Sequence, residues 1–342
     1  MFISANHTPF PAEGFTSIDK TCTKSFVVVV RATYDVDADG NCRVSEQQTP
    51  FVYADTPYGD PETTAIRVES DFVPIKPRAE VLLDAYAMAP AGAAADSVEV
   101  ALLGPSLDKR AVVTGERCWQ GGAFGLRASR AQPFERMPLA WHLAFGGTDR
   151  TFADPADARS DLRNPIGRGF QANPSTRAIE GRPLPCIERP QSRIENWDDR
   201  PDPIGFGPVS RFAAERACHA GTYDQHWMDE VLPFLPADFD NRYFMAAPPD
   251  QQLDGLAEGM AFACLNMNGS GVFRLRLPRL SVPVSFMFDD RIRVPTVTPD
   301  TLIVQPHEGR VVLLGRARAP LPRKFTRLRE VSVGVRRTQA GA

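Results

Sequence analysis

One irregular segment constrains this chain more than any other feature. It runs from Pro203 to Leu253 and reads PIGFGPVSRFAAERACHAGTYDQHWMDEVLPFLPADFDNRYFMAAPPDQQL. Aromatic residues, proline, glycine and carboxylates are concentrated in it, with almost no periodic pattern. Such a segment is ordered only if side chains satisfy its backbone polar groups and aromatic residues anchor it to a core. The sequence therefore predicts either a set of active-site loops or a rigid recognition surface.

Proline usage and strand patterns predict a mainly β fold around this segment. The chain has 31 prolines in 342 residues, well above the usual share of roughly 5%, and proline does not fit in helix interiors. Runs of β-branched and aromatic residues, separated by Gly, Pro and Asp, indicate strands. The predicted strands are 25–36, 80–87, 96–103, 110–115, 260–266, 271–277, 282–288, 301–305 and 310–315.

This pattern predicts sandwich-like antiparallel sheets with a long, loop-rich, short-helix insertion in the middle, at about residues 121–253. Short helices are expected at 208–218 and 223–231. Pro208 suits the start of the first helix, and Gly221 and Thr222 suit the end of the first and the start of the second. We interpret residues 1–342 as a single β-rich unit in which both ends of the chain pair into one sandwich. A separate basic β-module at residues 256–342 is the alternative.

Composition argues against several classes of function. The formal net charge of −3, from 39 basic and 42 acidic residues, gives no general attraction to nucleic acid. No apolar run approaches the roughly 18 residues of a membrane helix, and the first fifteen residues lack the basic and apolar regions of a signal peptide. We therefore expect a cytoplasmic protein with no nucleic-acid partner and no membrane partner.

The cysteines and the basic C-terminal stretch are weaker signals. The six cysteines show no CxxC spacing, so they predict reduced thiols and neither a disulfide framework nor a zinc ribbon. From Gly309 to Ala342, nine Lys and Arg residues oppose Glu330 alone. This stretch predicts a solvated basic edge, with a docking surface for an acidic partner as the alternative.

Histidines in the irregular segment raise the possibility of a metal site. Asp224 and His226 lie close together, and His219 comes seven positions before His226. On a helix, however, residues two apart do not share a face. A metal ion would also need a third ligand from elsewhere, such as Glu188 or Asp238. The sequence favours structural histidines over a metal site.

Carboxylates and a guanidinium alternate a few residues later. Asp238, Asp240 and Arg242 occupy every second position of ADFDNRY. Such residues commonly cap turns and clamp the backbone of irregular loops. The sequence therefore predicts structural roles for them, and no catalytic residue, metal or cofactor. The alternative is a hydrolase or carbohydrate-active enzyme on a β-sandwich, with Asp224, His226, Asp238 and Asp240 as its acid–base residues.

Nine sequence blocks between residues 76 and 278 occur in a characteristic order. They are KPRAEVLLDAYA (76–87), VTGERCW (113–119), MPLAWHLAFGG (137–147), NPIGRGF (164–170), LPCIERP (184–190), PIGFGPV (203–209), AGTYDQHW (220–227), LPADFDNRYFMAAPPDQQL (235–253) and FRLRLP (273–278). In these blocks the chain resembles the domain-of-unknown-function family 2169, which is found in Gram-negative bacteria beside type VI secretion genes.

The resemblance implies a non-enzymatic adaptor or chaperone. Members of the family are similar to chaperones that hold a secreted toxic effector in the cytoplasm and help to load it onto the secretion spike. The implied partners are the effector and the spike proteins, and the oligomeric state is left open. A third interpretation is an integral component of the secretion apparatus itself.

The residues shared with the family are mainly glycine, proline and aromatic; glycine and proline shape loops, and aromatic residues supply rigid contact area. The candidate protein-binding residues are Trp119, Trp197, Phe206, Trp227 and Tyr243. The candidate structural-motif residues are Gly146, Gly147, Gly167, Gly169, Gly205, Gly207, Gly221, Asp224, Asp238, Asp240 and Arg242.

Overall fold

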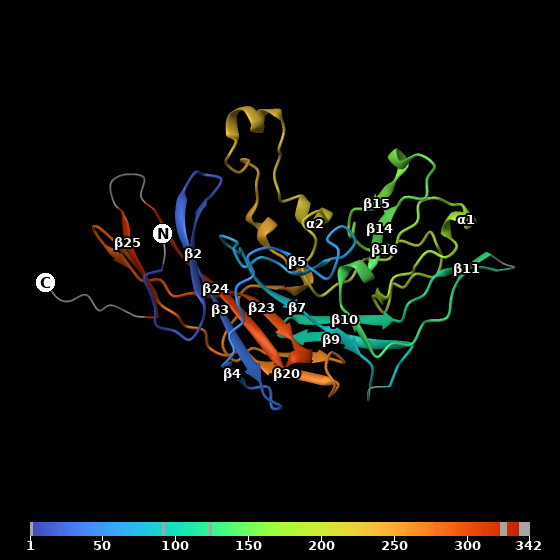
Figure 1. Ribbon diagram of the computed structural model, residues 1–342, viewed down its shortest axis with the longest axis horizontal. Helices are drawn as coiled ribbons and strands as arrows, with labels where there is room; N and C mark the ends of the chain where they lie inside the picture. The colour runs from blue at the N-terminus through green and yellow to red at the C-terminus, as the bar shows by residue number, and fades with distance from the viewer. Residues whose placement is uncertain (1–2, 91–92, 123–124, 322–326, 335–342) are drawn as a thin grey trace.

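The fold is an elongated assembly of sheets with loops on one side (Figure 1). The computed structural model describes residues 3–90, 93–122, 125–321 and 327–334. Strands make up 41% and helical turns 10%, which confirms the predicted mainly β class.

A central sheet of seven strands, counted over the described residues, crosses the middle of the molecule (Figure 1). In spatial order its strands are β18 (Gln252–Leu253), β7 (Ala79–Leu83), β23 (Thr298–Gln305), β24 (Arg310–Pro320), β3 (Lys24–Val36) and β2 (Ala12–Ile18), with β4 (Cys42–Val44) paired to the end of β3. β7 and β23 run parallel, and the other neighbours are antiparallel.

Two further sheets pack against one face of the central sheet. The first contains β17 (Ile187–Glu188), β10 (Leu107–Thr114), β9 (Ser97–Gly104), β19 (Ala261–Leu265) and β20 (Val272–Arg276). The second contains β1 (Ala5–Asn6), β25 (Leu328–Val333), β21 (Val284–Phe288) and β22 (Ile292–Arg293). One apolar core joins all three sheets, with Val28 from β3, Leu102 from β9 and Phe286 from β21 in the same cluster. This packing confirms the predicted sandwich.

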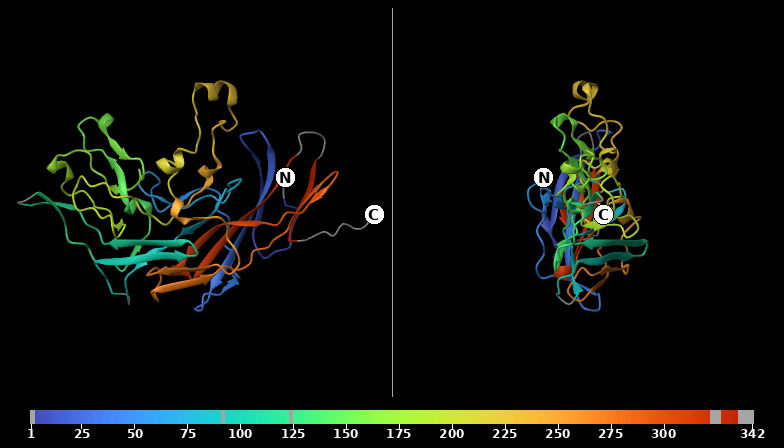
Figure 2. Two further views of the ribbon diagram at one scale, coloured as in Figure 1. Left: turned by 180° about the vertical axis from the view of Figure 1, so that it is seen from behind. Right: turned by 90° about the vertical axis from the view of Figure 1, so that its right-hand side faces the viewer.

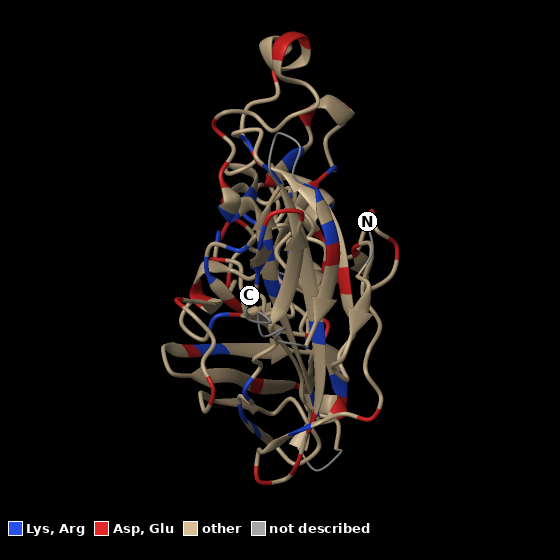
Figure 3. Cartoon of the chain, turned by 90° about the vertical axis from the view of Figure 1, so that its left-hand side faces the viewer, with Lys and Arg blue, Asp and Glu red and all other residues tan. Residues whose placement is uncertain are grey.

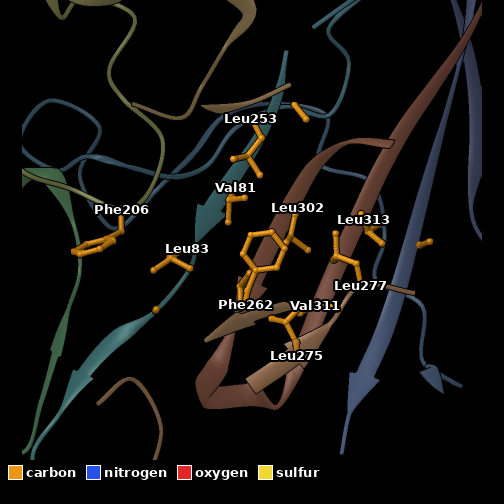
Figure 4. Packing of buried hydrophobic residues seen from close by; sticks show 14 of the residues in the cluster. Val81, Leu83, Phe206, Leu253, Phe262, Leu275, Leu277, Leu302, Val311 and Leu313 are labelled. Atoms are coloured by element: carbon orange, nitrogen blue, oxygen red, sulfur yellow. The ribbon is translucent and has the colours of Figure 1, made fainter. Parts of the chain in front are cut away.

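Figure 4 shows part of this core. Val81, Leu302 and Val311 come from the central sheet, and Phe262 and Leu275 come from β19 and β20. Each is less than 8% exposed, and Leu302 and Val311 are fully buried. Side chains from the two facing sheets therefore fill one continuous interior, as sheet-on-sheet packing requires.

Strand β3 shows why the sequence of a central strand is an unbroken run of apolar residues. Its residues from Phe26 to Val30 are all at most 1% exposed. Phe26, Val28 and Val30 belong to the core shared with the two smaller sheets, whereas Val27 and Val29 belong to a second cluster on the opposite face. A strand with both faces covered needs apolar residues at every position. Loops that carry Phe51, Ala246 and Ala247 cover that opposite face.

The rest of the described chain forms small sheets and single helical turns. The small sheets pair β11 (Trp119–Gly122) with β12 (Gly125–Ala128), β8 (Tyr86–Met88) with β13 (Arg136–Pro138), β5 (Thr56–Pro57) with β6 (Ile66–Val68), and β14 (Phe145–Asp149) with β15 (Arg159–Asp161) and β16 (Arg168–Gly169). The helical turns are α1 (Thr176–Ile179), α2 (Ala214–Ala217), η2 (Trp141–Leu143), η3 (Pro155–Asp157), η4 (Trp227–Val231), η5 (Asn241–Phe244), η6 (Pro249–Gln251) and η7 (Pro306–Glu308).

The two expected helices are much shorter than the sequence suggested. The helix predicted at 208–218 is reduced to α2, because the chain before it bonds to a neighbouring loop: the Val209 N–H donates to the Ala246 carbonyl at 2.8 Å. The helix predicted at 223–231 is a single π-helical turn, η4. At the first of these places a tertiary hydrogen bond overrides the local helix signal.

Strands from both ends of the chain share sheets. β24 pairs with β3 over eleven registered residue pairs, and β19 pairs with β9. Residues 256–321 are thus interleaved with residues 24–114, an arrangement expected when the two segments fold together. Within the described ranges, no helix is long and apolar enough to cross a membrane.

Close packing around Gly205 generates a stability prediction. A Cβ atom there would lie 2.4 Å from two ring carbons of Trp141, whose indole N–H donates to the Gly207 carbonyl at 2.9 Å. The ring cannot move without losing that bond, so we expect Gly205→Ala to lower the free energy of unfolding by about 1–3 kcal/mol. Urea denaturation followed by tryptophan fluorescence measures the change.

The matched control is Gly255→Ala, because a Cβ at Gly255 meets no atom within 4 Å. Its free energy of unfolding is expected to stay within about 0.5 kcal/mol of that of wild type. Equal stability of the two variants would show that the contact between Gly205 and Trp141 is not tight in solution.

Candidate functional site

A protruding segment, which we call the arm, comprises residues 219–240. It stands clear of the sheets beyond α2 in Figure 1 and in both views of Figure 2. Its two ends are joined at the base, where the Asp240 N–H donates to the His219 carbonyl at 3.0 Å. Slightly further out, the Thr222 N–H and hydroxyl both donate to the Asp238 carboxylate, at 3.0 and 2.8 Å. The arm is therefore a closed loop and not an open excursion of the chain.

Hydrogen bonds within the arm hold its two limbs together. The Asp224 carboxylate accepts from the Trp227 backbone N–H at 2.9 Å and so starts the π-helical turn η4. The Trp227 indole N–H crosses the arm to the Phe234 carbonyl, also at 2.9 Å. The Tyr223 ring packs edge-on against the Trp227 ring, with centroids 4.7 Å apart. These contacts give the arm a small interior of its own.

Apolar side chains gather on the outside of the arm. Among the described residues, eleven large apolar side chains are exposed, and five of them fall between residues 212 and 234: four on the arm itself, and Phe212 just before α2. They are Phe212 (83% exposed), Met228 (57%), Leu232 (57%), Tyr223 (51%) and Phe234 (39%). Scattered single exposed apolar residues need no explanation, but a concentration on one protruding segment makes the arm a candidate interaction site.

Arg216 of α2 holds together the chain segments that enter and leave the arm, which we call the foot of the arm. This side chain is 4% exposed and donates to the Tyr243 carbonyl at 3.0 and 3.1 Å, to the Val209 carbonyl at 2.8 Å and to the Glu69 carboxylate at 2.8 Å. It therefore joins the chain entering the arm, the chain leaving it and the loop after β6. From the other side, the Lys20 ammonium donates to the Phe239 carbonyl at 2.7 Å.

Glu69 is the buried acid of this foot. Its carboxylate pairs with Arg216 at 2.8 Å and with Arg211 at 2.9 Å. Burial works to raise the pKa of Glu69, but attraction to Arg216, Lys76 and Arg211 outweighs burial and holds the pKa below its ordinary value. The ionised form is thus part of the folded structure at neutral pH.

A hollow in the protein surface lies beside the foot of the arm. It has a volume of about 390 Å³ and is lined in part by Tyr53, Phe72, Arg211, Tyr243 and Phe244. The Tyr53 and Phe72 rings stack with centroids 5.1 Å apart. Tyr243 and Phe244 directly follow the arm in η5. The arm and this aromatic hollow form adjoining parts of the same loop-covered side.

The candidate protein-binding residues differ in burial and in their place in the fold. Trp119 is 1% exposed and Phe206 is fully buried, each inside an apolar cluster. The prediction that these two contact a partner does not fit the folded structure, because a partner cannot reach them. Trp197 is half-buried against the Trp119 cluster, Tyr243 is half-buried at the foot of the arm, and Trp227 is half-buried within the arm.

Four of the candidate glycines form a tightly packed turn that joins β14 and β16. At Gly146 (φ 136°) a Cβ would lie 2.2 Å from the Asn164 carbonyl oxygen, so only glycine fits. The Asn164 side chain donates to the Trp141 and Phe145 carbonyls, both at 2.9 Å. The remaining glycines of this turn are Gly147, Gly167 and Gly169, and Gly207 lies beside β7. Gly221 (φ 83°) sits at the base of the arm against Asp238.

The residues considered as an acid–base set have turn-forming contacts instead. Asp224 caps η4 and Asp238 binds Thr222, as described above. Asp240 accepts from the Arg242 guanidinium at 2.7 and 3.0 Å, and hydrogen bonds from Arg242 lower the pKa of Asp240 to about 2. His226 is exposed, with its Nδ1 3.7 Å from Glu230. Each contact supports a structural role for these carboxylates.

The more distant residue considered as a third metal ligand has other partners. Glu188, considered as a third metal ligand, accepts from Arg117 at 2.7 Å and from the Ile194 N–H at 2.7 Å. No group of three or more His, Cys, Asp or Glu side chains that could hold a metal ion occurs in the part of the chain that the structure describes.

The basic C-terminal stretch is described only in part. Arg318 and Arg310 pair with Asp19 and Glu308 at 3.2 and 3.1 Å. Arg316 pairs with Asp300 and is 8% exposed, so it is not part of a solvated edge. Four more basic residues lie outside the described residues: Arg323, Lys324, Arg336 and Arg337.

Comparison with known proteins identifies the family. The model of a family described as an uncharacterized protein conserved in bacteria (DUF2169) matches residues 22–316. The chain belongs to this family. No curated protein and no solved structure matches the chain. The DUF2169 match is wider on both sides than the segment 76–278 that carried the resemblance, and it includes the arm and most of the central sheet.

Sequence reasoning missed the residues that the arm exposes and those that support it. Met228, Leu232 and Phe234 were not among the candidate residues, nor were Arg216 and Glu69. The sequence did contain a signal for the first three. Residues 219–240 include carboxylates and no Lys or Arg, and large apolar residues lie among these carboxylates. Local sequence contains no comparable signal for the Glu69 and Arg216 pair, because 147 positions separate them.

The ion pair at the foot generates a pH prediction. Glu69→Gln is expected to lower the free energy of unfolding at pH 7 by about 3 kcal/mol, because it leaves Arg216 buried without its counter-charge. The pKa of Glu69 in the folded state lies below the ordinary value of 4.5, so the ionised carboxylate stabilises wild type above pH 4.5. This stabilisation is lost as the pH falls from 4.5 through the pKa of the folded state. The stability difference between wild type and Glu69→Gln should therefore narrow below pH 4.5, as measured by urea denaturation.

Asp108→Asn is the control, because the pair between Asp108 and Arg110 is exposed on both sides. It should change stability by less than about 1 kcal/mol at any pH. A stability difference for Glu69→Gln that stays constant down to pH 3 would contradict the assignment of Glu69 as an ionised partner of Arg216.

Proposed function

We propose that this DUF2169 protein is a non-enzymatic adaptor or chaperone. It binds a type VI secretion effector in the cytoplasm and assists its loading onto the secretion spike. The observation that carries the proposal is the arm, which exposes Met228, Leu232 and Phe234 on a loop held by its own hydrogen bonds.

The arm has the physical properties of a binding element. Aromatic residues and methionine are enriched at protein interfaces, and a few such side chains account for most of the binding energy. The internal bonds of Trp227 and Asp238 order the arm before any partner arrives. Little conformational entropy is then lost on binding, so more of the contact energy appears as affinity.

Holding and release follow from competition for the same surface. While the effector covers the arm, both apolar surfaces are shielded from water. Docking on the spike releases the adaptor if the docked effector conformation binds the arm more weakly. This cycle needs no nucleotide and no covalent chemistry.

Co-expression with the products of the adjacent genes tests the proposal. We expect a stable complex with one secreted neighbour, purified by affinity and sized by light scattering. Leu232→Ser/Phe234→Ser should weaken this complex by roughly 30-fold or more, as for central interface residues, without lowering the thermal midpoint of the protein. Isothermal titration calorimetry measures the affinity.

Ile292→Ser/Val294→Ser is the matched control, because these side chains are 37% and 38% exposed in or next to β22, outside the arm. The control should bind as wild type does. If no neighbouring gene product forms a complex, the adaptor proposal fails. If the arm variant and the control bind equally well, the partner contacts a different surface.

A further inference from the structure

The charge of the arm indicates what kind of surface it binds. Between residues 219 and 240 there are five carboxylates and no Lys or Arg. In Figure 3 the ribbon at the tip of the arm carries the colour of Asp and Glu and not that of Lys and Arg. Three of the five, Asp224, Asp238 and Asp240, accept backbone hydrogen bonds within the arm or next to it.

The other two carboxylates are at the tip, beside the exposed apolar side chains. Asp229 accepts from the Gln225 side-chain amide at 2.9 Å, and Glu230 lies 3.7 Å from the His226 ring, with a side chain that is 71% exposed. Neither has a Lys or Arg partner among the described residues. Both follow Met228 directly in the sequence and belong to η4 with it.

We propose that the arm inserts its apolar tip into an apolar depression on the effector that is bordered by Lys and Arg. This inference rests on the proposed function and adds the chemistry of the partner. A partner that buried Met228 and Leu232 would also desolvate the neighbouring Asp229 and Glu230. Desolvating a carboxylate without a counter-charge costs several kcal/mol, so the partner has to supply the cations that the arm lacks.

The same charge disfavours other classes of partner. Nucleic acid and anionic membranes are repelled by a tip that carries only negative charge. An uncharged apolar groove would desolvate Asp229 and Glu230 without compensation. A basic border both offsets that cost and steers the encounter, which makes association fast at low salt and slower as salt is added.

Association kinetics with the co-purified effector test the proposal. The variant is Asp229→Asn/Glu230→Gln, and the matched control is Glu62→Gln/Glu258→Gln, which removes two exposed carboxylates from the body. At low salt the association rate of the arm variant should fall about tenfold and lose most of its salt dependence. The control should keep the wild-type rate and salt dependence.

A second measurement locates the partner surface. A photo-crosslinking phenylalanine analogue at position 234 should crosslink to effector residues next to Lys or Arg. Changing those basic residues to Glu should abolish binding to wild type, and Asp229→Lys/Glu230→Lys should restore it. Crosslinks to an acidic or uncharged surface would overturn the proposal, as would an unchanged salt dependence in the arm variant.

The outcomes separate this inference from the proposed function. If the effector binds wild type and the neutralised arm with equal rates and equal salt dependence, the inference is overturned and the adaptor function stands. If no neighbouring gene product binds wild type at all, the adaptor function is overturned and the inference is overturned with it.

Discussion

The buried carboxylate of Glu80 connects the central sheet to the irregular loops that cover it. Glu80 lies on β7, pairs with Lys76, and accepts hydrogen bonds from the backbone amides of Ala246 and Ala247 at 2.8 and 3.0 Å. Irregular backbone has no neighbouring strand to satisfy it, so buried side chains must supply its hydrogen bonds. Arg316 acts in the same way from β24, with donations to the Asp71 and Val73 carbonyls. These bonds attach the loops that cover this face to the central sheet.

The arm is held in place by buried and internal side-chain contacts of the same kind. Arg216 and Glu69 hold its foot, and the bonds of Trp227 and Asp238 hold its limbs. Buried ion pairs cost desolvation and add little net stability, but breaking one is expensive. We interpret them here as devices that select one position for the arm. A rigid apolar and acidic projection is consistent with the proposed role of this protein as an adaptor that recognises another protein.

Part of this structure could be predicted from local sequence. The long strand β3 followed from its apolar run, and the capping by Asp224, Asp238 and Asp240 followed from side chains whose partners lie a few residues away or in the same loop. Whether an aromatic residue is buried or exposed could not be predicted in the same way. Trp119 and Phe206 looked as suitable for binding as Trp227, yet long-range packing buries the first two.

The sequence by itself determined the β class, the family and several main strands such as β3, β9 and β19, because alternation, β-branched runs and turn residues act over a few positions. It did not predict β2 or β25, and the single strand predicted at 80–87 is divided into β7 and β8. It also determined that the arm is acidic and lacks basic residues. Only the tertiary structure decided that this segment projects from the sheets with Met228, Leu232 and Phe234 exposed. The physical reason is that the position of the arm depends on contacts such as that between Glu69 and Arg216, whose partners are far apart in the chain and meet only when the sheets have assembled.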